Sequence, residues 1–384
     1  MAYLYKKLGP YTIKVGSGIT PKGGRSTYST SGIPFIRSQN VLWGRLDLFN
    51  VAYISQEQHR KMPKTDVKPG DLLLNITGAS IGRACVVPTE FKYGNVNQHV
   101  CIIRTKKELR SEYLLQFILS SQGQKQIAQF QAGGNRQGLN FKQIRSLLLP
   151  IPTLPEQFQI TELLRTWDEA IEKLEKLITA KERKNCDLVR ELICKKEKIW
   201  KPKKLGNLFT ERTEINCGSF ELLSITAGRG VVRRTEVDKV DSSSEDKSKY
   251  LRICPGDIGY NTMRMWQGVC GLSAHDGIIS PAYTVLIPSP EVDATFCSFY
   301  FKAPHVVDIF KRHSQGLVDD TLNLKYSHFS RIKLPFPPKE EQLRIAQILS
   351  TARSEIEILA KQLTALQKQK RGLMEKLLTG TWRV

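Results

Sequence analysis

The sequence predicts two copies of a mixed α/β (α+β) domain, joined by two long helices that form an antiparallel coiled coil. Three observations predict this fold class. Residues 149–193 and 334–378 superpose at a constant offset without a gap, and about a third of the positions are identical. Both stretches carry heptad spacing of apolar residues. The end of the chain leads back into a copy of its beginning, so the organisation is circular and pseudo-two-fold.

Each repeated stretch begins with a Leu-Pro-x-Pro segment and reaches a Glu-Gln pair before the helical spacing starts. The first copy has Leu149-Pro150-Ile151-Pro152 and Glu156-Gln157, and the second has Leu334-Pro335-Phe336-Pro337 and Glu341-Gln342. Prolines before a helix and acidic residues in its first turn both favour a helix N-terminus. About 40 helical residues would make a rod of roughly 60 Å.

Apolar residues in steps of three and four define a seam along both predicted helices. The seam consists of Leu164, Trp167, Ile171, Leu174, Ile178, Leu188, Leu192, Leu349, Ala352, Ile356, Leu359, Leu363, Leu366, Leu373 and Leu377. A helix with such a seam must bury it, and the other copy is the obvious partner. Lys181, Asn185 and Lys370 interrupt the seam. They fix the register of the pair or mark a frayed, solvent-facing stretch, and the sequence leaves both readings open.

The segment after the second helix and the N-terminal segment together match the segment after the first helix, which makes the repeat circular. Trp200 precedes Lys203-Lys204-Leu205-Gly206, whereas Trp382 stands near the C-terminus and Lys6-Lys7-Leu8-Gly9 near the N-terminus. A two-fold axis perpendicular to the helices would make them antiparallel. The predicted organisation is a first domain over 1–150, a first helix over 151–199, a second domain over 200–335, and a second helix with a tail over 336–384.

The two domains share an apolar scaffold and differ in their polar loops. Short strand-like runs alternate with Gly, Pro and Asn in residues 1–148, and helical spacing covers 112–129. Pro69-Gly70-Asp71 before one strand recurs as Pro255-Gly256-Asp257 before another. This pattern is expected for two copies of one binding domain with different specificities, although duplication followed by drift would also produce it.

The charge of the chain indicates a polyanionic partner. The net charge is +21, and residues 1–154 hold 21 Lys and Arg against 7 Asp and Glu. Residues 200–337 hold 18 against 15, so the excess is concentrated in the first domain. Nucleic acid is the first partner that such a charge suggests, although a merely basic surface is the alternative. No apolar run is long enough to span a membrane and the N-terminus lacks a signal-peptide core, so a cytoplasmic location is expected.

Several kinds of chemistry have no motif here. The sequence lacks a Walker loop, a strand–GxGxxG–helix pattern, Asn-Pro-Pro-[Tyr/Phe] and Gly-x-Ser-x-Gly. The 6 His and 8 Cys show no metal-ligand spacing, and the cysteines read as reduced, mostly buried thiols. Asp71 and Asp257 fit a turn before a strand better than a nuclease site. Glu182-Arg183-Lys184 fits a solvated helix face. We therefore expect no catalytic residue and no metal.

The two Leu-Pro-x-Pro–Glu-Gln helices, each after a variable domain, and the terminal Leu377-Leu378-Thr379-Gly380 resemble the specificity (S) subunit of type I restriction–modification enzymes. The resemblance covers essentially the whole chain. It implies two target recognition domains that each read half of a bipartite double-stranded DNA site. It also implies that the coiled coil sets the spacer and docks two methyltransferase (M) subunits, with motor-nuclease (R) subunits joining through the complex of S with its two M subunits. The subunit would be non-catalytic and without a cofactor, while SAM, ATP and Mg belong to its partners.

Polar loop residues are the candidates for DNA contact, because basic groups bind phosphates and polar side chains read base edges in the major groove. For each of them a solvated loop residue is the alternative, and the loops 132–140 and 226–234 are the favoured groups. In the first domain the candidates are Lys22, Arg25, Arg37, Gln39, Asn40, Asn75, Arg83, Asn97, Gln98, Asn135, Arg136, Gln137 and Asn140. In the second they are Thr226, Arg229, Arg233, Arg234, Asn261, Arg264, Gln267, Gln315, Asn323 and Lys325.

Two-fold-related domains on one face of DNA would read half-sites about one helical turn apart, roughly 34 Å. Because the two domains differ, the site should be asymmetric. Two other functions remain open at this point: a specificity subunit of a modification-only or fused type II system, and a basic coiled-coil scaffold that binds no defined sequence.

Overall fold

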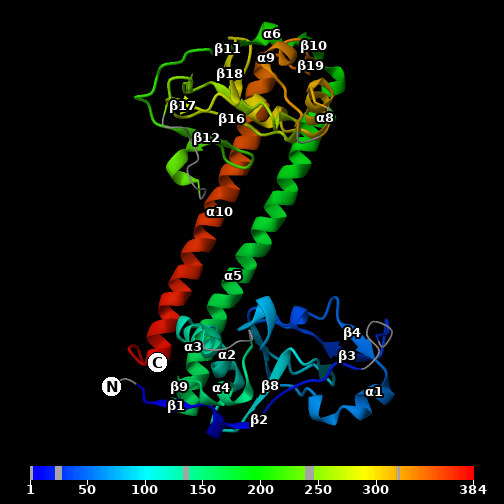
Figure 1. Ribbon diagram of the computed structural model, residues 1–384, viewed down its shortest axis with the longest axis vertical. Helices are drawn as coiled ribbons and strands as arrows, with labels where there is room; N and C mark the ends of the chain where they lie inside the picture. Colours follow the sequence, from blue (N-terminus) through cyan, green and yellow to red (C-terminus); the bar gives the residue numbers. More distant parts are fainter. Residues whose placement is uncertain (1–2, 22–27, 133–137, 238–245, 317, 319–320) are drawn as a thin grey trace. The chain divides into compact units, whose positions relative to one another are not determined.

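The computed structural model describes residues 3–21, 28–132, 138–237, 246–316, 318 and 321–384 (Figure 1). The chain forms two compact units. Unit 1 contains Met1–Glu175 and Gln362–Val384, and unit 2 contains Lys176–Lys361. Each long helix therefore begins in one unit and ends in the other.

Unit 1 contains a four-stranded antiparallel sheet of order β2-β8-β5-β6, a three-stranded sheet β4-β3-β7 and the pair β1-β9. Its elements are β1 (Tyr5–Lys7), β2 (Thr12–Ser17), β3 (Ile33–Ile36), β4 (Ala52–Ile54), α1 (Gln56–Lys61), β5 (Leu72–Asn75), β6 (Ala84–Val86), β7 (Asn95–Val96), β8 (Val100–Thr105), α2 (Ser111–Leu119), α3 (Ser121–Ala132), α4 (Phe141–Ser146), β9 (Leu148–Pro150) and the start of α5 (Leu154–Val189).

Unit 2 contains a four-stranded sheet of order β11-β18-β15-β16 and the pairs β10-β19, β12-β13 and β14-β17. Its elements are β10 (Lys201–Lys204), α6 (Leu205–Leu208), β11 (Phe209–Glu211), β12 (Leu223–Thr226), β13 (Gly230–Arg233), β14 (Leu251–Ile253), β15 (Ile258–Asn261), β16 (Cys270–Leu272), β17 (Gly277–Ile279), β18 (Tyr283–Pro288), α7 (Ala294–Tyr300), α8 (Pro304–His313), α9 (Tyr326–Phe329), β19 (Lys333–Phe336) and the start of α10 (Lys339–Thr379).

The predicted fold class is confirmed, because the main sheets of the two units have the same strand order. In unit 1 the order β2-β8-β5-β6 takes strands from the same relative places in the chain as β11-β18-β15-β16 in unit 2. The units differ in the strands outside this sheet. Unit 1 has the parallel pair β3-β7, whereas unit 2 has an isolated parallel bridge between Leu222 and Ile278 and, next to it, the antiparallel hairpin β12-β13. The shared sheet carries the core, so the variable strands and loops are free to differ.

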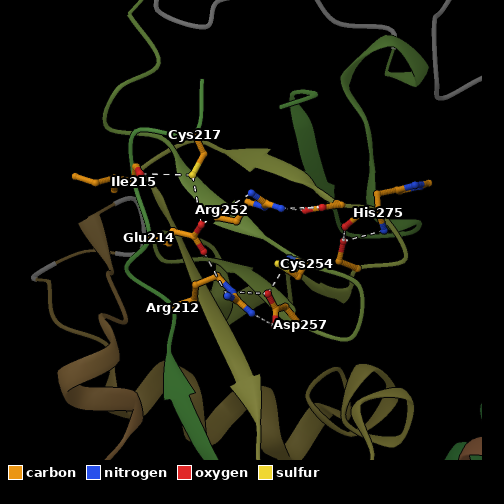
Figure 2. A network of polar contacts seen from close by, with 10 residues as sticks. Arg212, Glu214, Ile215, Cys217, Arg252, Cys254, Asp257 and His275 are labelled. Carbon is orange, nitrogen blue, oxygen red and sulfur yellow. Dashed lines mark hydrogen bonds and ion pairs between the residues drawn. The ribbon is translucent and has the colours of Figure 1, made fainter. Parts of the chain in front are cut away.

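The Pro-Gly-Asp turns are held by buried ion pairs. Asp71, only 1% exposed, accepts a hydrogen bond from the backbone N–H of Lys68 and a bidentate contact from Arg104 at 2.7 and 2.8 Å. Asp257 takes a similar contact from Arg212 at 2.8 and 3.2 Å (Figure 2). The arginine comes from β8 in unit 1 and follows β11 in unit 2. Both aspartates are therefore structural, in line with the turn interpretation.

The helical spacing over 112–129 is interrupted in the structure. Helix α2 ends at Leu119 and α3 begins at Ser121, because Ser120 adopts an extended conformation with ψ 161°. The Ser120 hydroxyl accepts a hydrogen bond from the N–H of Gly123 at 3.1 Å and donates one to the carbonyl of Phe117 at 2.6 Å. Ser120 thus caps α3, and a serine at this place is a helix-start signal.

The first long helix also ends earlier than the seam predicts. Helix α5 stops at Val189, and Arg190–Cys194 form a π-helical turn that contains the seam residue Leu192. Ile193 in this turn is fully buried in the core of unit 2, whereas Leu192 only packs against that core. A π turn contains one extra residue, so it shifts which side chain faces inward.

The two long helices run antiparallel to each other in both units. In unit 1, Glu156 lies 3.8 Å from Arg383, and Asp168 further along α5 pairs with Lys370 at 2.5 Å. In unit 2, Lys181 pairs with Glu355 at 2.5 Å. All seam residues are buried or half-buried, and most of the intervening positions are exposed. Two of the polar seam interruptions, Lys181 and Lys370, thus form cross-helix ion pairs, which supports the register interpretation.

The N- and C-terminal segments meet in unit 1. The Tyr3 hydroxyl donates a hydrogen bond to Glu156 at 3.4 Å, and the Arg383 guanidinium lies over the Tyr3 ring at 4.8 Å. Gly380 has φ +74°, and a Cβ there would lie 2.7 Å from the Tyr3 ring. The glycine is needed both for the turn and for this close approach. These contacts agree with the circular organisation predicted from the sequence.

Within the described residues, no helix is both long and apolar enough to cross a membrane, and no group of His, Cys, Asp and Glu has the arrangement of a metal site. All eight cysteines fall in the described part of the chain and are free. Four of them are buried: Cys85, Cys101, Cys270 and Cys297.

Candidate nucleic-acid interface and helix junctions

Turns that are far apart in the sequence meet at one end of the main sheet of unit 1. The backbone N–H of Leu139 donates to the carbonyl of Ile76 at 2.9 Å, and Ile76 N–H donates to His99 at 3.0 Å. Thr77 pairs with Gly138 through an isolated bridge and hydrogen-bonds the His99 ring. Hydrogen bonds from the Asn75 amide to Ser38 and Val41 join the 37–41 turn to this group, so the turns 37–41, 76–83, 97–99 and 138–140 are held together. We call this set of turns rim 1.

Three candidate asparagines, one at the end of β5 and two in rim 1, are buried and support the turns. Asn75 is fully buried, and its amide donates to the carbonyls of Ser38 at 2.8 Å and Val41 at 3.3 Å. Asn40 is 2% exposed and Asn97 is 7% exposed. Both accept backbone N–H hydrogen bonds within their own turns. Satisfying buried backbone groups explains why amides stand there.

Other candidates of unit 1 remain at the surface. Gln39, Gln98 and Asn140 are exposed, and Arg83 is half-buried. Asn140 also caps α4, since its side chain accepts from the N–H of Gln143 at 2.8 Å. Arg37 lies over the Tyr28 ring at 5.7 Å. The remaining candidates lie outside the described residues: Lys22, Arg25, Asn135, Arg136 and Gln137.

Unit 2 builds the equivalent place from its own turns. The N–H of Leu324 donates to the carbonyl of Thr262 at 2.8 Å, and Thr262 N–H donates to Ala282 at 3.1 Å. Gln315 and Asn323 exchange two backbone hydrogen bonds at 2.8 and 2.9 Å. We call this set rim 2; it includes the described parts of 261–269, 280–283 and 315–325. The structure thus brings together candidates that stand more than fifty residues apart in the sequence.

Rim 2 exposes a basic and aromatic surface. Its exposed candidates are Arg264, Gln267, Gln315 and Lys325, while Asn323 is half-buried with an unpaired Oδ1. Asn261 is half-buried and accepts from Met263 N–H at 3.0 Å, so it shapes the turn. The prediction missed Lys311, Arg312 and His313 at the end of α8, all exposed beside rim 2. Lys311 lies over the Trp266 ring at 4.9 Å. A cluster of basic residues in the last turn of a predicted helix could have revealed them.

The favoured group 226–234 lies on the β12-β13 hairpin and has partners within the protein. Thr226 accepts a hydrogen bond from Arg229 N–H at 3.1 Å and thereby shapes the turn. The Arg229 guanidinium is paired with Glu236, and Arg233 lies 3.4 Å from Glu221. Arg234 is half-buried and also interacts with other groups. These pairs reduce the positive charge that the hairpin offers to a phosphate.

The repeated Glu-Gln motif has a structural explanation that the sequence did not provide. Gln157 is fully buried; its amide donates to the carbonyls of Glu108 and Pro152, both at 3.0 Å, and accepts from Arg110 N–H at 2.9 Å. Gln342 is 1% exposed and makes the matching set with Glu291 at 3.1 Å, Pro337 at 3.0 Å and Asp293 at 2.8 Å. Each glutamine thus attaches the first turn of a long helix to its own domain. We call this arrangement the glutamine clasp.

Next to each clasp, the helix exposes the same pair of apolar positions. Phe158 and Leu163 on α5 are 48% and 36% exposed, and the repeat-equivalent Leu343 and Ile348 on α10 are 49% and 37% exposed. Large apolar side chains are thus exposed at equivalent places in both units.

Comparison with known proteins bears on this architecture. The type I restriction modification DNA specificity domain matches residues 13–182 and 268–368 of this chain. The chain belongs to this family. This specificity-subunit chain is 22% identical to the putative type I restriction enzyme MjaX specificity subunit of Methanocaldococcus jannaschii, over 96% of this chain and 91% of the relative. It is 29% identical to the EcoBI specificity subunit of Escherichia coli over 37% of this chain and 30% of the relative.

Solved structures of specificity subunits share the fold. The S subunit of a type I system from M. genitalium aligns with a TM-score of 0.60 at 14% identity, covering 98% of this chain and 96% of that chain. The HsdS subunit from Thermoanaerobacter tengcongensis aligns with a TM-score of 0.51 at 15% identity, covering 99% of this chain and 97% of that chain. These likenesses show the fold that the resemblance in the sequence implied, and membership of the family rests on the family model.

Proposed function

We propose that the two units read the two halves of an asymmetric, bipartite double-stranded DNA site. The observation that carries this proposal is the pair of equivalent rims. Each rim is built on the main four-stranded sheet of its own unit, and the two rims expose different polar side chains. Rim 1 offers Gln39, Gln98 and Asn140, and rim 2 offers Arg264 and Gln267, among others. Amides favour adenine and arginine favours guanine in the major groove, so different sequences should be read.

Phosphate contacts would supply most of the affinity. The first domain has a large excess of Lys and Arg. The second has a small excess, but exposes Arg264, Lys311, Arg312 and Lys325 in or beside rim 2. Such groups bind the phosphates of the DNA backbone without reading its sequence, and the rims then add base contacts.

The long helices would set the spacer between the half-sites. Helix α5 has 36 residues and α10 has 41, and each runs from one unit into the other without a proline in its middle. The glutamine clasps attach both helices to their domains through buried hydrogen bonds. A continuous helix of fixed length is a suitable ruler, because its rise is about 1.5 Å per residue.

The duplicated apolar surfaces beside the clasps would bind two copies of the same partner. We propose that Phe158 and Leu163 on α5, and Leu343 and Ile348 on α10, each contact one methyltransferase (M) subunit. Equal exposure at equivalent positions supports equal sites. Methyl transfer to adenine, DNA translocation and cleavage would belong to the M and R subunits, which would bring SAM, ATP and Mg. Methylation would require the M subunit to flip the adenine out of the duplex.

The test is to map methylated adenines in DNA exposed to the chain together with the M subunits of its own system. We expect one asymmetric site with a non-specific spacer. Deleting residues 173–179 and 358–364 removes one heptad from repeat-equivalent places in α5 and α10, or about 10 Å of helix. The spacer should then shorten by about 3 bp at 3.4 Å per base pair, with both half-sites unchanged. Duplicating the same residues should lengthen it equally.

Affinity should fall in both variants, because a change of about 3 bp also rotates one half-site around the DNA axis. No enriched sequence in the methylation map would favour a non-specific scaffold. Altered half-sites, or a spacer that does not change, would contradict the role of the helices. A modification-only system would give the same map without ATP-dependent cleavage.

A further inference from the structure

The tip of the β12-β13 hairpin in unit 2 is tied to two other elements of that unit. The Lys302 amine, which follows α7, donates to the carbonyl of Ala227 at 3.0 Å. The Arg353 guanidinium, from α10, donates to the carbonyl of Gly228 at 2.8 Å. Two cations thus hold two successive carbonyls of one turn. Hydrogen bonds with a charged donor are stronger than neutral ones, so this is a firm attachment.

The hairpin itself is a rigid part of the domain. Leu223, Ile225 and Val231 from its strands are buried in one cluster with residues of β14, β17 and β18. A Cβ at Gly271 on β16 would lie 2.4 Å from the Cα of Gly230, so the hairpin lies directly against the main sheet. A force on the tip is therefore transmitted to the sheet that carries rim 2.

Part of the attachment is unfavourable, because the Lys302 amine loses hydration on burial. Burial, together with the nearby Arg353, lowers the pKa of the Lys302 amine, although Cys270 acts in the opposite direction. Glu357 is the carboxylate that pairs with Arg353, at 3.1 Å. Two cations placed close together around neutral carbonyls repel each other, and an apolar contact could hold a hairpin without that cost.

Unit 1 uses the equivalent position differently. Asp168 is the repeat equivalent of Arg353; it pairs with Lys370 of α10 and lies 3.4 Å from the Gln116 amide of α2. In the described part of unit 1 this position makes no hydrogen bond to a hairpin turn. The two domains are thus attached to their helices by different side chains at the same helical position.

We propose that Lys302 and Arg353 are positioning residues that hold the hairpin as a strut between α10 and the second recognition domain. The strut sets the angle at which rim 2 is presented to its half-site, and its tip does not read bases. This inference rests on the proposed reading of a bipartite site. In this proposal the hairpin 226–234 determines how strictly the complex requires one spacer length, whereas the sequence alone suggested direct DNA contact.

The test uses the complex with M subunits and DNA duplexes in which the spacer is the mapped length, one base pair shorter or one longer. Arg353→Gln should reduce the preference for the mapped spacer by about tenfold in methylation rate, a factor that corresponds to the loss of one such bond. Arg353→Lys keeps a donor for Gly228 and should restore at least half of the preference. Arg371→Gln removes an exposed charge from the same helix and should behave as wild type.

A residue that only stabilises the fold would slow methylation of all three duplexes equally, so the ratio between them is the decisive quantity. An unchanged ratio for Arg353→Gln would overturn the proposal, and so would a changed second half-site, which would make the hairpin a base reader. If Arg353→Gln does not fold, Lys302→Met removes the other bond and should shift the ratio in the same direction. A wild-type complex that shows no bipartite preference would instead refute the proposed function.

Discussion

Replacing Gln342 with alanine should loosen the start of α10 from its domain. The Gln342 side chain is 1% exposed and makes three hydrogen bonds, two to carbonyls and one to a backbone N–H. Truncation leaves the carbonyls of Glu291 and Pro337 and the N–H of Asp293 without this partner. Each buried polar group that loses its partner costs about 1–3 kcal/mol, although a water molecule that enters the space would offset part of this cost.

We therefore expect the free energy of unfolding of unit 2 to fall by about 3 kcal/mol, the low end of the roughly 3–9 kcal/mol that three full penalties would give. For a unit of this size, 1 kcal/mol corresponds to roughly 2–4 °C in Tm, so the expected loss is about 6–12 °C. Gln342→Glu keeps the shape but replaces two donated hydrogen bonds with a buried negative charge facing carbonyls. It should destabilise the unit at least as much as alanine does.

Thermal unfolding followed by circular dichroism measures this effect, and the urea midpoint checks it independently. Gln347→Ala is the matched control, because Gln347 is an exposed glutamine on the same helix and should change Tm by less than about 2 °C. Gln157→Ala should destabilise unit 1 to a similar extent, since its three hydrogen bonds have nearly the same lengths. A Tm for Gln342→Ala within about 1 °C of the wild type would refute the clasp as an anchor.

Two further predictions concern the helix surface and the thiols. Phe158→Asp and Leu343→Asp should each remove one M subunit from the complex, and the double variant should bind none, as measured by light scattering. The control is Leu177→Asp, because Leu177 is also exposed but its repeat equivalent is Gln362; this variant should still bind two M subunits. Loss of both M subunits in either single variant would contradict two independent sites. Burial raises the pKa of the Cys85 and Cys101 thiols to about 12, so iodoacetamide at about pH 8 should label the exposed Cys186 first, as read by mass spectrometry. Equal labelling of buried and exposed cysteines would show that the cores open readily.

Local patterns explain why the architecture was accessible from the sequence. The seam repeats every three to four residues, and residues such as Leu164 and Leu349 are buried where that period places them. The Pro-Gly-Asp turns were recognised because proline, glycine and aspartate each favour a turn for a local reason. The break at Ser120 and the π turn after Val189 were missed, because each depends on a local competition between hydrogen bonds that periodicity does not show.

The candidate site was predicted only in part, because exposure depends on tertiary contacts. Asn75 ends β5 and Gln98 stands just before β8, yet Asn75 is fully buried under the 38–41 turn and Gln98 is exposed. Lys311 was overlooked, since it stands on a helix whose closeness to Trp266 is established only by folding. The roles of Gln157 and Gln342 were equally hidden, because two of the three partners of each glutamine stand about fifty residues earlier in the chain.

The sequence by itself determined the duplicated plan, the antiparallel pairing of two long helices and the family, because repeats, heptads and turn motifs are encoded within short stretches. The tertiary structure alone decided which polar side chains support turns and which remain exposed. It also showed that Arg353 and Asp168, equivalent in the repeat, hold different partners. The physical reason is that a buried polar group must find a hydrogen-bond partner, and only the folded chain determines which group is within reach.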